Sequence, residues 1–113
     1  EMRLTAMNAR KVDGMYKSSR ITGPYHNFLG LRFSSTKPAQ ITFIPRPFVG
    51  ETPVIDVTCL ESAVLAGVRD GWAETREQLF VSEIEYVPSD TAIYTGYHIL
   101  AKAIVEVASR DDA

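Results

Sequence analysis

The chain has 113 residues, and 45% of them are apolar, which is enough to build one core without support from a metal or disulfides. Cys59 is the single cysteine, so an internal disulfide framework is excluded. No apolar run is long enough to span a membrane, and the first residues lack the layout of a signal peptide. We therefore expect a single domain over residues 1–113, located in the cytoplasm, with no membrane partner.

The two parts of the chain differ in the sign of their charge, although the net charge is only −2. Residues 1–46 carry eight Lys and Arg against two acidic residues, whereas residues 47–113 carry four against twelve. One interpretation is a basic surface that binds a polyanion, and the other is that folding intermixes the two signs.

Four segments are candidate strands. Residues 27–34, 40–45 and 80–87 alternate in the way that is typical of half-buried strands, and residues 1–7 provide a fourth candidate. In the first strand, Leu29, Leu31 and Phe33 are expected on one side and Phe28 on the other. In the third strand, one side is expected to carry Phe80, Ile84 and Tyr86, and the other Val81, Glu83 and Glu85.

Two helices are expected after the second of these strands. The first begins near Asp56, where Thr58 and Glu61 have the spacing of a capping box. Gly67 costs about 1 kcal/mol of helix propensity relative to alanine, so we expect a facing strand to approach it closely. The second helix is expected to be capped by Ser89 or Asp90 and to end near Ser109. The side chains that should be buried by the two helices are Leu60, Val64, Val68, Ile93, Tyr97, Leu100 and Ile104.

This order of elements predicts an α+β domain with a four-stranded sheet and both helices on one face. No catalytic or ligand-binding pattern accompanies it. His26, His98 and Cys59 lack the spacing of a zinc site, and no segment resembles a phosphate-binding loop. Alternating acids such as Glu83 and Glu85 are typical of the solvated side of a strand. We therefore expect no metal, no cofactor, no nucleotide and no enzymatic activity.

Four stretches between residues 10 and 109 carry a family resemblance. They are VDGMYKSSRITGPY at 12–25, LGLRF at 29–33, SAVLAGVRD at 62–70 and YHILA at 97–101. Together they resemble domain IV of elongation factor G and of the related ribosomal-protection proteins, whose corresponding segments read V-E-G-x-Y-K with a basic loop and G-Q-Y, a hydrophobic strand, P-A-V-x-x-G-I-R-E, and F-K-L-A-A. The helix at 62–70 is the most specific of the four.

The resemblance implies the fold of the second domain of ribosomal protein S5, including a left-handed βαβ crossover, which breaks the general right-handed rule. It also implies a tip of two loops that enters RNA or a ribosomal groove. The tip-loop residues would be Ser18, Ser19, Thr22, Gly23, Ser89 and Asp90. The basic residues that would contact phosphate are Lys17, Arg20, Arg10 and Lys11. The chain departs from the family in lacking its glycine-rich first loop and its tip histidine.

Two functions of different classes remain open. One is a stand-alone module, similar to domain IV, that binds RNA or the ribosome through its tip loops. The other is a non-catalytic homo-oligomeric assembly or small-ligand-binding protein that kept the fold without the ribosomal role. In addition, an exposed edge strand is a common surface for self-association, so we expect a dimer or a higher assembly.

Overall fold

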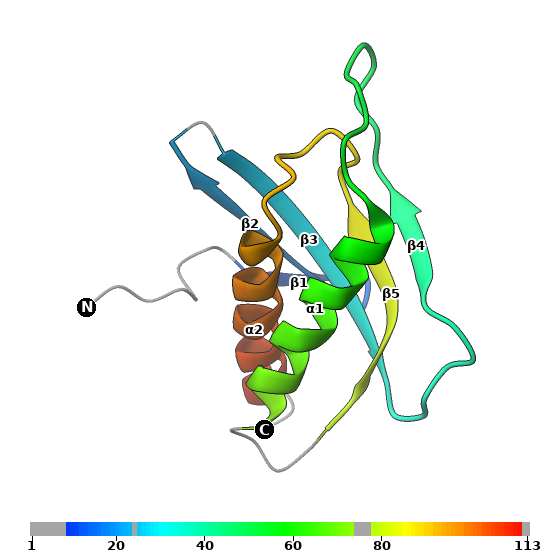
Figure 1. Cartoon of the computed structure of the whole chain (residues 1–113). Coiled ribbons are helices and arrows are strands. Elements are labelled where there is room, and N and C mark those ends of the chain that lie inside the picture. The colour runs from blue at the N-terminus through cyan, green and yellow to red at the C-terminus, as the bar shows by residue number, and fades with distance from the viewer. Residues whose placement is uncertain (1–8, 24, 74–77, 112–113) are drawn as a thin grey trace.

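The computed structural model describes residues 9–23, 25–73 and 78–111. Its elements, in chain order, are β1 (Arg10–Val12), β2 (Met15–Thr22), β3 (Tyr25–Ser34), β4 (Thr42–Pro45), α1 (Val57–Trp72), β5 (Phe80–Tyr86) and α2 (Tyr94–Asp111). Figure 1 shows both helices on one face of the sheet. The expected α+β class is therefore confirmed, and the opposite face, called the open face below, carries no helix of the described chain.

The sheet has five strands in the order β1-β2-β3-β5-β4, so the expected number of four was wrong. The strands that sequence reasoning missed are β1 and β2, which form a hairpin. Asp13 and Gly14 join them with φ values of 53° and 81°, the left-handed conformation that two-residue hairpin turns require. Because β2 is mostly polar, its alternation is weak. The candidate strand at residues 1–7 lies outside the described residues.

All neighbouring strands are antiparallel except β4 and β5, which are parallel and are connected through α1. In Figure 1, with the helices toward the viewer, both of these strands run upward and β5 lies to the left of β4.

A β-bulge changes which side chains of β5 face the core. Arg32 pairs with Glu83 but Phe33 pairs with Val81, so Ser82 is an extra residue in β5. Val81 is consequently buried and Phe80 is 42% exposed, the reverse of the expected sides. Beyond the bulge, Ile84 and Tyr86 are buried in the core as expected.

The first helix begins where the sequence predicts, but the second begins later. Asp56 is the N-cap of α1, because its Oδ1 accepts hydrogen bonds from the backbone N–H groups of Thr58 and Cys59. Ser89 and Asp90 do not cap α2, since Asp90 instead accepts a hydrogen bond from β3. Ile93 therefore precedes the helix and is 36% exposed, contrary to the expectation that it is buried.

The core lies between the helices and the sheet. The expected residues Leu60, Val64, Val68, Tyr97, Leu100 and Ile104 are all buried there, together with Leu29 and Leu31 of β3. Gly67 is packed against α2 and not against a strand as expected. A Cβ on Gly67 would lie only 2.3 Å from the backbone oxygen of His98, so the two helices pack with almost no space between them at this point.

Candidate functional site

The expected tip-loop residues divide between a strand and two connections. Ser18, Ser19 and Thr22 belong to β2, which pairs with β3 as far as Thr22 opposite Tyr25, so their assignment to a loop was wrong. The pairing of residues 16–22 with β3 is the physical reason, because it continues up to the turn at Gly23, whose φ is 58°.

Ser89 and Asp90 lie in the connection between β5 and α2, which is hydrogen-bonded to the first residues of β3. The backbone N–H of Phe28 donates to Asp90 Oδ2 at 2.7 Å, and the Asn27 side chain donates to the Thr91 carbonyl oxygen at 2.8 Å. Burial raises the pKa of Asp90 above its ordinary value, against the opposing effects of the Phe28 N–H and of His26. The turn at Gly23 and this connection lie at the same end of the sheet (Figure 1).

The four basic residues expected to contact phosphate are divided between the two faces of the sheet. Arg10 and Lys17 are paired across β1 and β2, and both line a depression on the open face. Lys11 instead pairs with Tyr16, a core residue, and its Nζ lies 5.4 Å from the centre of that ring. Arg20 lies beside the start of α2, where its Nη1 is 3.7 Å from the position that a Cβ on Gly96 would take. The structure therefore does not bring the four together.

The open face is organised by a row of residues that are in register across all five strands. Arg10 pairs with Lys17, Lys17 with Gly30, Gly30 with Glu85, and Glu85 with Ile44. Because Gly30 has no side chain, Lys17 Nζ reaches Glu85 Oε1 at 3.2 Å, an ion pair without hydrogen-bond geometry. A Cβ on Gly30 would lie 2.8 Å from the same oxygen. The glycine thus provides the space in which the carboxylate is held.

Glu85 is only 1% exposed and has a second cationic partner, so the expectation that it solvates the outer side of β5 was wrong. The Nε of Arg46 pairs with Glu85 Oε2. Arg46 directly follows β4, and its backbone N–H donates to the Tyr86 carbonyl oxygen at 2.8 Å, which fixes the start of its side chain over β5. Because two cations share one carboxylate, the group has one excess positive charge. The Arg46 side chain is 61% exposed, so much of its guanidinium is accessible. We call Lys17, Arg46 and Glu85 the charged triad.

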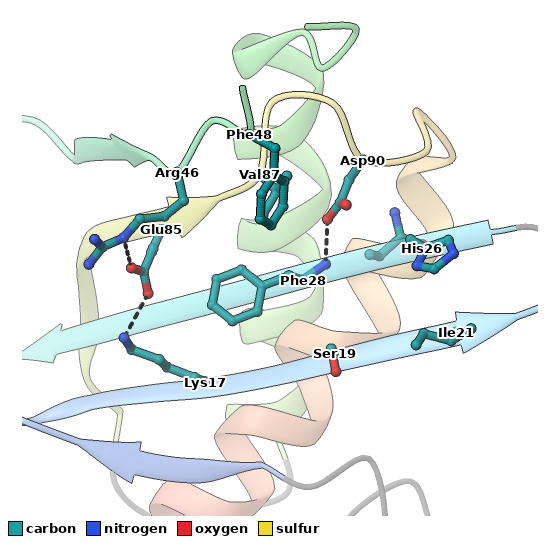
Figure 2. A pocket seen from close by; sticks show the side chains of 11 residues that line it. Lys17, Ser19, Ile21, His26, Phe28, Arg46, Phe48, Glu85, Val87 and Asp90 are labelled. Carbon is teal, nitrogen blue, oxygen red and sulfur yellow. Dashed lines mark hydrogen bonds and ion pairs between the residues drawn. The ribbon is translucent and has the colours of Figure 1, made fainter. Parts of the chain in front are cut away.

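A pocket of about 480 Å³ extends from the charged triad along the open face toward Asp90. Figure 2 shows Phe28 of β3 on the floor of this pocket, with Phe48 of the β4–α1 connection and Val87 beside it. Sequence reasoning did not find this site. Phe28 gave a faint signal as a lone aromatic residue on the polar side of its strand, and Phe48, in an irregular segment, gave none.

No metal centre is seen in the described ranges, where no three His, Cys, Asp or Glu side chains are close enough together to hold an ion. Within the same ranges, neither helix is long and apolar enough to cross a membrane.

No protein-family model matches the sequence, and a search of curated proteins finds no match.

Proposed function

We propose that this chain is an RNA-binding module related in fold to domain IV of elongation factor G, and that it contacts single-stranded RNA through the open face of its sheet. The observation that carries the proposal is the pocket on this face, where Lys17 and Arg46 lie at one end of an aromatic floor formed by Phe28. Sheet surfaces that combine exposed aromatic rings with basic side chains are a common platform for unpaired RNA, since bases stack on the rings and phosphates meet the cations.

The charge of the open face supports this function. Its strands and the residue that follows β4 contribute four cations, Arg10, Lys17, Arg32 and Arg46, against two carboxylates, Glu83 and Glu85. These residues give the face an excess of two positive charges, which Asp90 at the far end of the pocket lowers to one, in a chain whose net charge is −2. Three of the four cations come from β1, β2 and β3, so part of the charge asymmetry of the sequence becomes an asymmetry between surfaces.

The arrangement of elements supports the family likeness. Three strands, a helix, a strand and a helix follow one another from β2 to α2, and α1 connects two parallel neighbours. With the helices toward the viewer, the second of these strands lies to the left of the first, as a left-handed crossover requires. This rare handedness is what the fold of the second domain of ribosomal protein S5 would provide.

Binding of a short single-stranded RNA, and of ribosomes, at low and moderate salt tests the proposal. Arg10 is exposed and outside the charged triad, so Arg10→Ala removes a phosphate contact without disturbing Glu85. We expect weaker binding and a salt slope reduced by about 0.7, the change for one cation on a single strand. Arg69→Ala, an equal loss of charge on exposed α1 surface, is the matched control and should bind as the wild type does.

Arg20→Ala separates the open face from the tip, because Arg20 lies beside α2 and not on the open face. Loss of binding in Arg20→Ala but not in Arg10→Ala would place the RNA-binding surface at the end of the sheet that carries the turn between β2 and β3. No binding by the wild type at low salt, where electrostatic contacts are strongest, would end the RNA proposal.

Self-association is the second candidate, and the free edges of the sheet favour it. Among the described strands, β1 and β4 each have one neighbour only, and an unpaired edge can add a strand from a second copy. Sedimentation equilibrium tests this proposal. A dimer that is lost on introducing a proline at Lys11 would place the contact on β1, and a monomer at high micromolar concentration would refute it.

A further inference from the structure

We propose that the pocket between the charged triad and Asp90 is a subsite for one unpaired nucleotide, with the base stacked on Phe28 and under Phe48 and the phosphate held by Arg46. This inference rests on the proposed RNA-binding function and assigns a definite place and orientation to one nucleotide. It concerns a residue of an RNA strand and not a free nucleotide cofactor.

The size and the apolar lining of the pocket suit a planar base. Its volume of about 480 Å³ lies within the range of roughly 300–1,000 Å³ that is usual for small-molecule sites. Phe28 and Phe48 reach it from different parts of the chain, β3 and the β4–α1 connection, and Val87 lies beside them (Figure 2). Phe48 is 59% exposed, so a large part of its ring is free to cover a ligand. Every base has a flat π-face, so stacking between two phenyl rings accepts any of the four.

The charges at the two ends of the pocket fix the orientation of the nucleotide. At one end the triad has one more cation than it has carboxylates, and Arg46, the more exposed of the two cations, can turn part of its guanidinium toward a phosphate. At the other end lies Asp90, one of whose oxygens accepts the Phe28 N–H. A phosphate would be repelled from this carboxylate and attracted to Arg46, so the base is directed toward Phe28.

Glu85 determines how much of the cationic charge is available. With its carboxylate in place, the two cations are held over β5 and present one net charge. A phosphate that approaches Arg46 competes with Glu85 Oε2, and Lys17 remains beside Oε1 to keep the buried carboxylate paired. The triad thus offers a replaceable partner to the phosphate without leaving a buried charge alone.

The test compares aromatic and aliphatic side chains at the same positions. Phe28→Leu and Phe48→Leu keep the apolar bulk but lose the ring, and each should weaken binding of a short RNA by about fivefold or more while leaving the salt slope unchanged. Phe80→Leu is the matched control, because Phe80 is 42% exposed on the same sheet and does not line the pocket. Because the Phe48 ring is largely exposed in the wild type, melting curves should show that Phe48→Leu is as stable as the wild type.

Photocrosslinking gives an independent readout. An RNA carrying 5-iodouridine should crosslink to a peptide that contains Phe28 or Phe48. An RNA that carries abasic nucleotides should bind the wild type less tightly than the normal RNA does. The double variant Phe28→Leu/Phe48→Leu should bind the two RNAs with equal affinity. Unchanged affinity in both leucine variants, with Arg10→Ala still weakening binding, would overturn the subsite and leave the RNA function standing. Crosslinks to other parts of the chain would also overturn it. A wild type that binds no RNA would refute both proposals.

Discussion

The two faces of the sheet are built by different means, although the same strands contribute to both. On the helix-covered face, Leu29, Leu31 and Ile84 are fully buried against α1 and α2, and apolar periodicity alone specifies which residues these are. On the open face, the side chain of Glu85 is buried as well, and it is held by register between Lys17 and Arg46 over Gly30. Burial of apolar side chains thus determines the first face, whereas the second depends on pairing between distant segments.

The largest effect should come from the helix-covered face. Leu100→Ala removes a side chain that is 0% exposed, and we expect it to lower the free energy of unfolding by about 2–5 kcal/mol through lost transfer energy and a cavity. The control is Leu65→Ala on α1, where the side chain is 38% exposed and the loss should stay below about 1 kcal/mol. Urea unfolding measures both. Equal losses would contradict the assignment of the core.

The contact between the helices gives the next largest effect. The sign of the stability change in Gly67→Ala shows whether the two helices pack closely at this position. Helix propensity alone predicts that Gly67→Ala stabilises α1 by about 1 kcal/mol. The new Cβ, however, would lie 2.3 Å from the His98 backbone oxygen, so the helices must separate. We expect a net loss of about 1–3 kcal/mol. A variant with a raised melting temperature would show that the helices are not in such close contact.

Glu85→Gln tests the contribution of the open face to stability. The variant removes the shared negative charge, but Lys17 and Arg46 are partly exposed and can be hydrated, so the stability loss should be modest, about 1–2 kcal/mol. Glu83→Gln is the control, because its pair with Arg32 is partly exposed and should contribute less than about 1 kcal/mol. Under the proposed function, Glu85→Gln should bind RNA more tightly even though it is less stable. A parallel fall in stability and affinity would contradict the assigned role of the triad.

The smallest effect at neutral pH concerns Tyr97, a fully buried core residue of α2. Burial raises the pKa of Tyr97 from 10.0 to about 12, and its hydroxyl lies near the Asn27 side chain without good hydrogen-bond geometry. Ionisation is therefore easier in the unfolded state. The wild type should lose stability as the pH rises from about 10 toward about 12. Tyr97→Phe should change neutral stability by less than about 1 kcal/mol and should lack this alkaline loss. Tyr25→Phe, at an exposed ring, should retain it.

Most of the covered face could be predicted from the sequence, because apolar residues at helical or strand spacing have few alternatives. Leu60, Val64, Leu100 and Ile104 are buried as the 3.6-residue period predicts. The errors occur where contacts outside a segment determine its structure. The extra residue at Ser82 exchanges the sides of the sheet on which the Phe80 and Val81 side chains lie. The hydrogen bond from Phe28 holds Asp90 in the connection between β5 and α2, away from the start of the helix.

The candidate site was less predictable for the same reason. Glu83 and Glu85 have the same local pattern, yet one is partly exposed beside Arg32 and the other is buried. The difference comes from Gly30 and Arg46, which no local window around β5 contains. Of the four basic residues proposed from the family resemblance, only Arg10 and Lys17 reach the open face, because a strand sends successive side chains to opposite sides.

The charged triad also has a consequence for the lifetime of the folded state. Arg46 and Glu85 are 39 positions apart in the chain, and Lys17 joins them only when β2, β3 and β5 are already in register. Contacts between segments distant in the sequence carry a loop-closure cost before they stabilise the chain, so we expect the triad to form late in folding. The triad should therefore hardly affect the folding rate, and it should slow unfolding. The main effect of the triad would then be to lower the unfolding rate and so to extend the time that the chain remains folded.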